Sequence, residues 1–253
     1  MEHLFTLIDK VEENKYDLQA IIKQAKNKIL DLAIQGKLVQ QDLNEEPASE
    51  LLKRINPKAE ITCDNGQYGK RPFEIPNSWC WSRLGDINNI ARGGSPRPIK
   101  DYLTDDKNGI NWIKIGDTTR EGKYIDSVKE KIRPEGMKKS RFVHKGDFLL
   151  TNSMSFGRPY ILNVDGCIHD GWLVISPIGE VYTSDFLYHL LSSSFAFEQF
   201  TNVASGGVVT NLNSDKVADT IFPVPPLAEQ QRIVAKIEKL FEQLDYIENS
   251  LEA

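Results

Sequence analysis

The sequence predicts an α+β protein in which one mixed α/β domain lies between two long terminal helices. Near both ends of the chain, apolar residues recur at alternating steps of four and three, the heptad spacing of helices that pack against other helices. Between the ends, short strand-like runs are separated by Gly, Pro, Asn and Asp. With 253 residues, the chain is long enough for one large domain or for an ordinary domain plus an accessory element.

The predicted N-terminal helix covers roughly 32 residues and therefore about 48 Å. Gly36 follows it where a C-terminal cap belongs. Because such a helix is too long to be covered by a compact domain on one side, we expect another helix as its partner. Its seam is apolar except for one lysine and consists of Leu4, Ile8, Val11, Lys15, Leu18, Ile22, Ala25, Ile29 and Leu32.

The middle of the chain predicts a short helix, a linker and then a mixed domain. Asn44–Ile55 is interpreted as a loop and a short helix capped by Ser49, and Ser184–Phe200 has helical spacing with Ser184 as its cap. The strand-like runs are Gly109–Asp117, Gly146–Ser153, Arg158–Val164 and Gly171–Ile178. The predicted divisions are a helical region at 1–60, a linker at 61–71, the mixed domain at 72–226 and a second helical region at 227–253.

The C-terminal helix is predicted to begin after Pro225 and Pro226, with Glu229 in the first turn, where the helix dipole favours an anion. Its seam comprises Ile233, Ile237, Leu240, Leu244, Ile247 and Leu251. Both terminal seams predict contact with a second subunit. The residues expected at this interface are Leu4, Ile8, Val11, Leu18, Ile22, Ile29, Ile233, Ile237, Leu240, Leu244 and Ile247.

The charge of the chain is unevenly distributed. The net charge of -5 by itself argues against nucleic acid as a partner. From Arg83 to Arg158, however, Lys and Arg outnumber Asp and Glu by 16 to 10, whereas Pro159–Pro226 holds one Lys against seven acids. This gathering of cations is typical of a phosphate-facing surface. The alternative is a surface fluctuation with no partner.

The remaining bulk features indicate a soluble, cytoplasmic chain. Hydrophobic residues make up 40% and charged residues 26%, and no run resembles a signal peptide or a membrane span. The cysteines Cys63, Cys80 and Cys167 are odd in number and widely separated, which fits neither a disulfide framework nor a zinc cluster. We therefore expect a reducing compartment.

The sequence lacks the familiar catalytic signatures. It has no Walker A motif, no dinucleotide-binding glycine pattern, no HExxH and no nucleophile elbow. His169 beside Asp170 is interpreted as structural rather than catalytic, and Cys167 as a small core residue rather than a nucleophile. We expect no metal site and no catalysis by this chain alone.

Four polar loops are the candidate binding elements. They are Ala91–Lys100 (ARGGSPRPIK), Lys138–Asp147, Thr151–Pro159 and Ala204–Asn213. Backbone N–H groups and guanidinium groups in such loops suit phosphates and the O6/N7 edge of guanine. Singly each is an ordinary solvated loop, but together they favour nucleic acid. The candidate DNA-binding residues are Arg92, Gly94, Ser95, Arg97, Lys100, Lys114, Arg120, Lys138, Lys139, Arg141, Lys145, Ser153, Arg158, Ser205, Thr210 and Asn211.

Several segments resemble the specificity subunits of type I restriction-modification systems. Pro223–Asp245 (PVPPLAEQQRIVAKIEKLFEQLD) is similar to the segment that closes a target recognition domain and opens a helical region in that family. Ala20–Ile55 is similar to the other half of the helical region, with Gln40 where the family usually has Pro. Pro72–Ile87 (PFEIPNSWCWSRLGDI) resembles the opening of the recognition domain. The similarity covers nearly the whole chain.

The resemblance implies a protein that selects DNA but leaves catalysis to partners. In the family, a modification subunit methylates adenine with S-adenosylmethionine, and a restriction subunit translocates and cleaves. S-adenosylmethionine, ATP and Mg are accordingly expected in partner subunits, with no cofactor in this chain. The terminal helices are expected to pair antiparallel as a coiled coil, which forms a rigid spacer and a docking surface for modification subunits.

Family members usually carry two recognition domains and two helical regions, whereas this chain has one of each. We therefore expect a half-length form that reads one half of a bipartite site. Two copies related by a twofold axis would read a palindromic site. A spacer of about 48 Å corresponds to about 14 base pairs.

Individual roles within the domain are expected to differ. Phosphate contacts are expected from Arg92, Arg97, Lys138, Lys139 and Lys145, and base contacts from Ser153, Arg158, Thr210 and Asn211. The main alternative function is a coiled-coil dimeric protein-interaction module without a DNA role. An enzyme that uses His169 or Cys167 is the third.

Overall fold

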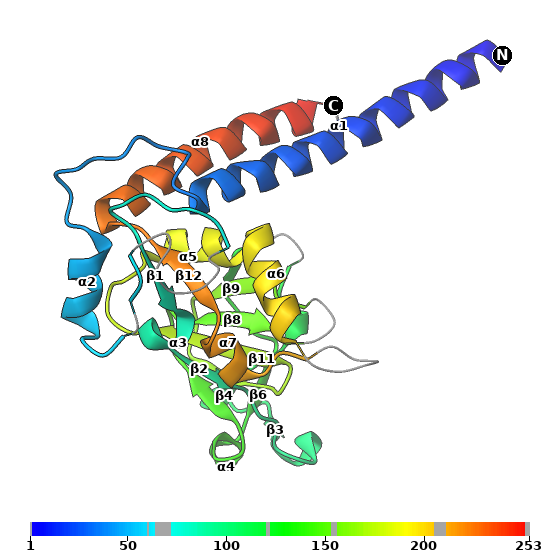
Figure 1. Ribbon diagram of the computed structural model, residues 1–253. Helices are drawn as coiled ribbons and strands as arrows, with labels where there is room; N and C mark the ends of the chain where they lie inside the picture. Colours follow the sequence, from blue (N-terminus) through cyan, green and yellow to red (C-terminus); the bar gives the residue numbers. More distant parts are fainter. Residues whose placement is uncertain are drawn as a thin grey trace.

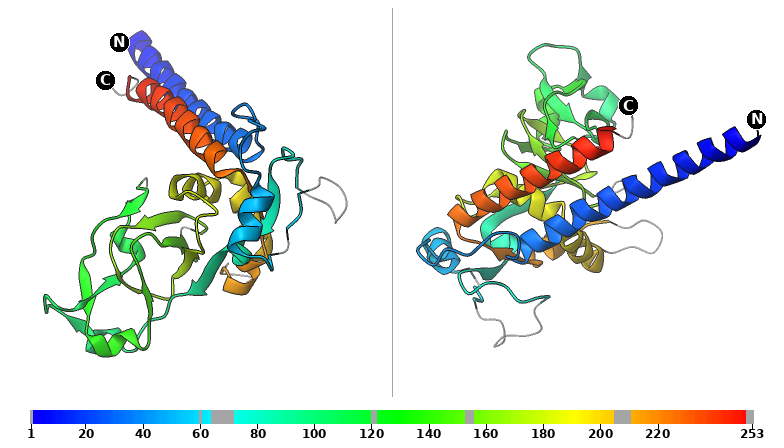
Figure 2. Two further views of the ribbon diagram at one scale, coloured as in Figure 1. Left: turned by 90° about the vertical axis from the view of Figure 1, so that its left-hand side faces the viewer. Right: turned by 90° about the horizontal axis from the view of Figure 1, so that it is seen from above.

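The computed structural model describes residues 2–59, 61–63, 72–119, 122–152, 156–204 and 211–250, with side chains from residue 15 onward. Two long helices, α1 (Glu2–Ile34) and α8 (Leu227–Ser250), lie side by side above a domain of strands and short helices (Figure 1). The two ends of the chain lie toward the same end of this helix pair (Figures 1 and 2). In the described residues, no helix is both long enough and apolar enough to cross a membrane.

The domain is built on two large sheets and one small one. The small sheet pairs β1 (Cys80–Arg83) with β12 (Ile221–Val224). Sheet I contains, in order, β2 (Asn88–Arg92), β11 (Trp172–Pro177), β8 (Phe148–Thr151), β9 (Pro159–Leu162) and β5 (Tyr124–Ile125). Sheet II contains β3 (Leu103–Thr104), β6 (Glu130–Ile132), β4 (Ile110–Ile113), β10 (Gly166–Ile168) and β7 (Arg141–Val143).

Short helices surround these sheets. The α-helices are α2 (Ala48–Ile55), α3 (Leu84–Ile87), α4 (Pro134–Met137), α5 (Ser184–Leu191), α6 (Ser194–Val203) and α7 (Ser214–Ala218), and the 3₁₀ turns are η1 (Ile99–Asp101) and η2 (Ile115–Asp117). The four strand-like runs of the sequence contain β4, β8, β9 and β11, as predicted. α5 and α6 lie between the sheets and the helix pair (Figure 1).

The long helices start and stop where the sequence predicts. α1 ends at Ile34, and Gly36 has the positive φ of 68° that a C-terminal cap requires. The amide of Lys37 then bonds back to the carbonyl of Leu32 at 2.9 Å, which satisfies one of the last free carbonyls of the helix. α8 begins at Leu227, directly after the two prolines.

One apolar core joins the helix pair to the domain. It contains the inner part of α1, including Ile34, together with Ile233 and Ile237 of α8, and buried aromatic residues such as Trp81 and Phe222 of the small sheet. A second cluster, which includes Ile113, Val143, Leu149, Trp172 and Val174, draws residues from both large sheets. The helix pair and the sheets therefore form one packed body, rather than a domain attached by a loose tether.

A buried carboxylate lies where α8 meets the domain. Glu229 is 1% exposed. It accepts a hydrogen bond from the indole N–H of Trp79 at 2.8 Å and another from the side-chain amide of Gln41. Burial raises the pKa of Glu229, although both hydrogen bonds act in the opposite direction. The neighbouring side chain of Gln230, also buried, accepts from the amide of Thr183 at 2.8 Å and donates to the carbonyl of Val181 at 2.8 Å. The first turn of α8 is thus bound to the segment after α1, to Trp79 and to the segment before α5.

A histidine lies further along the same contact. His189 of α5 is buried edge-to-face against Phe241 of α8, with the ring centroids 6.0 Å apart. Burial lowers the pKa of His189 to about 4. The imidazole is therefore neutral at pH 7 and packs as an apolar ring.

The structure corrects the expected subunit interface. Ile22, Ile233 and Ile237 are at most 3% exposed within a single chain, so they belong to its own core and are not available to a partner. Heptad spacing fixes which face of a helix is apolar but not what covers it. Ile29, Leu240 and Leu244 are partly buried, Leu18 and Ile247 are exposed, and the side chains of Leu4, Ile8 and Val11 lie outside the described residues.

Helix caps also differ from the prediction. Pro47, not Ser49, precedes the first residue of α2, and Thr183, not Ser184, caps α5 through its side chain. The segment predicted as one helix at 184–200 is two helices, because Ser193 caps a new helix, α6. A capping hydroxyl must precede the first turn, and the predicted boundary was two residues late for α2 and one residue late for α5.

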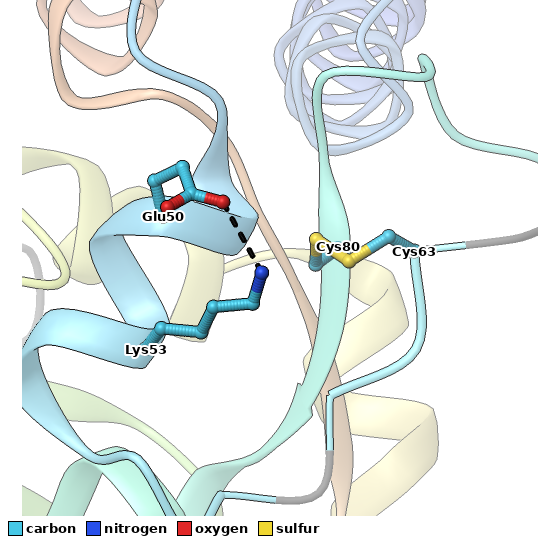
Figure 3. Close-up of a disulfide and its surroundings, with 4 residues drawn as sticks. All are labelled: Glu50, Lys53, Cys63 and Cys80. Atoms are coloured by element: carbon cyan, nitrogen blue, oxygen red, sulfur yellow. Dashed lines mark hydrogen bonds and ion pairs between the residues drawn. A yellow bond between two sulfur atoms is a disulfide. The ribbon is translucent and has the colours of Figure 1, made fainter.

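The prediction that the cysteines form no disulfide was wrong. Cys63 and Cys80 form a disulfide that ties the segment before residue 64 to β1, while Cys167 is free and buried (Figure 3). An odd number of cysteines excludes complete pairing but not one pair. Thr62 also bridges Trp81, so residues 61–63 of the predicted linker are attached to the small sheet.

The buried carboxylate generates a stability prediction. Replacement of Glu229 by alanine leaves the indole N–H of Trp79 without its partner inside the protein, so we expect a loss of about 1–3 kcal/mol in the free energy of unfolding. Urea denaturation measures this loss. The control is Glu238→Ala, an exposed glutamate on the same helix, which should unfold close to wild type. Equal midpoints for both variants would contradict the prediction.

Candidate nucleic-acid interface

The topology of sheet I gathers several loops at one edge. From β2 to β9 neighbouring strands are antiparallel, so β2 and β8 end where β11 and β9 begin. The register places Arg92 opposite Leu173, Thr151 opposite Trp172, and Leu150 opposite Pro159. At about 4.8 Å per strand, the row from β2 to β9 is about 14 Å long. We use the name loop edge for the strand ends at Arg92, Thr151, Pro159 and Trp172, together with the loops attached to them.

Asn152, together with the adjacent Thr151, anchors three parts of the loop edge. This residue follows β8 and is fully buried. Its amide donates to the carbonyl of Gly171 at 2.9 Å, and its side-chain oxygen accepts from the amide of Leu212. The adjacent Thr151 hydroxyl accepts from the amide of Arg158 at 2.9 Å. The turn before β11, the start of β9 and the segment before α7 are thereby tied to the end of β8.

The loop after β2 is pressed against the turn between β10 and β11. The amide of Gly93 donates to the carbonyl of Trp172 at 2.9 Å, and the amide of Gly94 donates to that of Ile168 at 3.2 Å. A Cβ at position 93 would lie 2.1 Å from the carbonyl oxygen of His169. Glycine is therefore required there for the two backbones to approach this closely.

Asp170 binds three residues of the same loop. One carboxylate oxygen accepts from the Ser95 hydroxyl at 2.7 Å, and the other lies 3.2 Å from Nη2 of Arg97. The backbone carbonyl of Asp170 accepts from Nε of Arg92 at 3.2 Å. The Ser95 hydrogen bond is the largest cause of a lowered pKa for Asp170, and the charge of Arg97 adds to it. The group is therefore ionised at neutral pH.

A second basic segment, Lys138–Arg141, lies against the first. The guanidinium Nε of Arg141 donates to the carbonyl of Arg92 at 2.9 Å, and the Ser140 hydroxyl donates to that of Ile168 at 2.9 Å. Nζ of Lys139 lies 2.6 Å from the hydroxyl of Tyr102 and 5.0 Å from the centre of its ring. The topology thus joins two basic stretches that are about forty residues apart in sequence. Arg92, Arg97, Lys100, Lys138, Lys139 and Arg141 are all exposed.

His169 has a structural position in this arrangement. The amide of Ile115 points at its Nε2 at 3.2 Å, and the amide of Gly171 points at its Nδ1 at 2.9 Å. Burial lowers the pKa of His169, so the ring is neutral and can accept from one of these amides. Cys167 is fully buried in β10. Both residues lie as the structural interpretation of the sequence expected.

Three predicted contact residues are not among the exposed cations of the loop edge. Lys145 lies beyond the far end of β7, where its amide bonds to Asp165 at 2.7 Å. Lys114 is near His169, but its ammonium pairs with Glu130. Arg158 is at the start of β9, half-buried, with its guanidinium 5.4 Å from the centre of the Tyr160 ring. Asn211 is partly exposed beside Leu212.

Four predicted residues have no structural description. Arg120, Ser153, Ser205 and Thr210 lie outside the described residues.

Two important residues were missed as site residues by sequence reasoning, namely Asn152 and Asp170. An Asn directly after a run of four buried strand residues was the available signal for Asn152. Nothing local indicated that Asp170 would bind side chains some seventy-five residues earlier in the chain.

Comparison with known proteins places the chain among restriction-modification proteins. The model of the type I restriction modification DNA specificity domain matches residues 76–253. Identity to the type I restriction enzyme EcoEI specificity subunit of Escherichia coli is 26%, over 97% of this chain and 45% of that protein. Identity to the type I restriction enzyme MjaIX specificity subunit of Methanocaldococcus jannaschii is 29%, over 70% of this chain and 40% of that protein. The chain spans about half the length of the relatives it matches.

Solved structures show a similar fold. The HsdS subunit from Thermoanaerobacter tengcongensis superposes with a TM-score of 0.57 at 18% identity, over 99% of this chain and 53% of that chain. A chain from a structure of a type I R-M system gives a TM-score of 0.57 at 19% identity, over 98% of this chain and 53% of that chain. The mixed sheets and long helices are therefore an arrangement found in this group of proteins.

The position of Asn152 generates a prediction about the loop edge. In an Asn152→Ala variant the buried amide of Leu212 loses its acceptor, so we expect that amide to become about 1–3 kcal/mol less protected. Hydrogen exchange followed by mass spectrometry measures this for peptides that contain Leu212. The matched control is Asn163→Ala, at the opposite end of β9, where the amide bonds to Asp126. Unchanged exchange at Leu212 in the Asn152 variant would refute the anchoring role.

Proposed function

Because this chain belongs to the type I restriction-modification DNA specificity domain family, we propose that it selects the DNA target for catalytic partner subunits and carries no catalysis itself. The observation that carries the proposal is the convergence of the Ala91–Lys100 loop and the Lys138–Arg141 segment at one edge of sheet I. Arginine and lysine side chains from separate parts of the sequence share this exposed surface. Such a surface suits the phosphates of duplex DNA.

Within this proposal, the loop edge reads one half of a bipartite DNA site. Exposed Lys138 and Lys139 are positioned to neutralise phosphates and to set the register of the domain on the duplex. Arg158, at the start of β9, and Asn211 are the predicted base contacts that the described residues include, and Arg158 is the charged one. Its guanidinium carbon lies 5.4 Å from the centre of the Tyr160 ring, and the planar guanidinium matches the O6 and N7 acceptors of guanine.

The helix pair supplies the spacing in this proposal. α1 and α8 act as an antiparallel coiled coil, and Lys26 of α1 pairs with Asp245 and Glu248 of α8. Beyond the inner core the pair carries exposed apolar residues, namely Tyr16, Leu18, Ile21, Tyr246 and Ile247. A second copy of the chain and modification subunits dock along this outer part. The dimer places the modification subunits for adenine methylation and recruits the restriction subunit.

The cofactors of the reaction belong to the partners. S-adenosylmethionine is expected in the modification subunits, and ATP and Mg are expected where DNA is translocated and cleaved. Among the described residues, no cluster of three or more His, Cys, Asp or Glu could hold a metal ion. The assembled complex acts on DNA in the cytoplasm in this proposal.

The twofold arrangement predicts the form of the DNA target. Two identical recognition domains should select a palindromic site whose halves are separated by an unread gap. Methylation mapping of DNA from cells that make this chain with its modification subunit identifies the site. Light scattering of the same purified complex should give two copies of this chain. An asymmetric or continuous target would exclude the twofold model.

Two variants separate phosphate contact from base contact. Lys138→Ala should weaken binding to every sequence and lower the salt dependence by about one ion, because one phosphate contact is lost. Arg158→Ala should cost about 1–3 kcal/mol and relax the sequence preference at a single base position. Both are measured by fluorescence anisotropy on the complex with the modification subunit, at several salt concentrations.

The control for these variants is Lys58→Ala, an exposed lysine in the turn after α2. It should bind DNA as wild type does. If Lys58→Ala weakened binding as much as Lys138→Ala, the effect would be one of total charge, and the loop edge would not be the binding surface.

A further inference from the structure

Asp170 is an unexpected residue at the centre of a basic surface. Its carboxylate is 42% exposed and lies among the exposed side chains of Arg92 and Arg97. An ionised carboxylate there repels DNA phosphates and so lowers affinity for every sequence. An exposed ion pair of this kind also contributes little to folding stability. Neither general affinity nor stability accounts for its presence.

The contacts of Asp170 hold two arginines in fixed positions. The Ser95 hydroxyl donates to one carboxylate oxygen and accepts from the amide of Asp170 at 3.3 Å, so the carboxylate itself is fixed by a closed pair of bonds. The other oxygen engages Nη2 of Arg97, and the backbone carbonyl engages Nε of Arg92. His169 Nδ1 lies 3.7 Å from the carboxylate, but that ring is neutral at pH 7. Arg97 is thus the cation that pairs with the Asp170 carboxylate, and Arg92 is held beside it through the backbone carbonyl.

The geometry at Arg97 leaves part of its guanidinium free. Asp170 accepts from one of the two N–H groups of Nη2, so the other N–H of Nη2 and a neighbouring N–H still form one parallel pair of donors, while the side chain is 81% exposed. Two parallel donors in one plane match O6 and N7 of guanine. A guanidinium whose plane is already set loses less conformational freedom when it makes that contact. A phosphate contact needs no such fixed plane.

Resting on the proposed function, we infer that Asp170 is a positioning residue that orients Arg97, with Arg92 beside it, for reading a base edge. Asp170 lowers non-specific affinity for DNA and raises discrimination between the target and other sequences. Arg97 is accordingly a specificity-determining residue and not a phosphate contact. This assignment differs from the role that its position in a basic loop suggests.

The test compares two ways of removing one negative charge. Asp170→Asn keeps an acceptor for Ser95 but releases the charged contact with Arg97. Asp101→Asn, in η1 of the same basic region, removes an exposed carboxylate. Each variant is assembled with the modification subunit. Dissociation constants are measured for the site found by methylation mapping and for a duplex of random sequence, across a range of salt concentrations.

The expected result is a split between affinity and discrimination. Both variants should bind random duplex several-fold more tightly than wild type, because each removes a charge that repels phosphates. Only Asp170→Asn should lower the ratio of specific to random affinity, by about tenfold. Arg97→Ala should lower that ratio similarly in the wild-type background and add little in the Asp170→Asn background. Ser95→Ala, which frees the carboxylate from its other side, should lower the ratio in the same direction.

Two results would overturn the inference. If wild type discriminates but Asp170→Asn keeps the full ratio, Asp170 does not position a base contact, and the proposed function stands. If the wild-type complex binds the mapped site and random duplex equally, the proposed function fails and the inference fails with it.

Discussion

The fixed angle between the helix pair and the recognition domain depends on one buried carboxylate. Glu229 would be costly to bury without partners, and the hydrogen bonds from Trp79 and Gln41 offset that cost. Trp79 directly precedes β1, Gln41 follows α1, and Glu229 belongs to α8. Three distant segments therefore have to meet for one group to be satisfied. Such a requirement specifies a single arrangement more sharply than apolar contact, which many arrangements provide.

From this junction a short path leads to the proposed DNA-binding surface. β1 and β12 pair beside it, α3 follows β1 directly, and β2 then runs out to Arg92. β2 is in turn aligned against β11, the strand that follows Asp170. Every step is a hydrogen-bonded ladder or a turn of a few residues. The position of the loops relative to the helices is accordingly set by rigid elements, as the proposed spacing role requires.

Regular sequence patterns made the long helices and several strands predictable. Contacts between residues far apart in the sequence could not be predicted. The heptad steps, the two prolines and Gly36 defined both long helices, and alternating runs located β4, β8, β9 and β11. The same heptad could not tell an intramolecular core from a subunit interface, so Ile233 and Ile237 were assigned to the wrong partner. The basic loops could be recognised in the sequence from their lysines and arginines. Their contacts could not, because Asn152, Asp170 and the Cys63–Cys80 bond depend on residues that only the tertiary fold brings together.

The polar loops are anchored at the ends of strands. Substitutions in these loops are thereby separated from substitutions in the helix pair. Ladder hydrogen bonds hold the ends of β2, β8, β9 and β11 in a row, whatever side chains the intervening loops carry. In the proposed function, substitutions in the loops alter which bases are preferred, while the core that the long helices share with β8, β9 and β11 is unchanged. A substitution confined to these loops therefore need not disturb the packing of the helix pair.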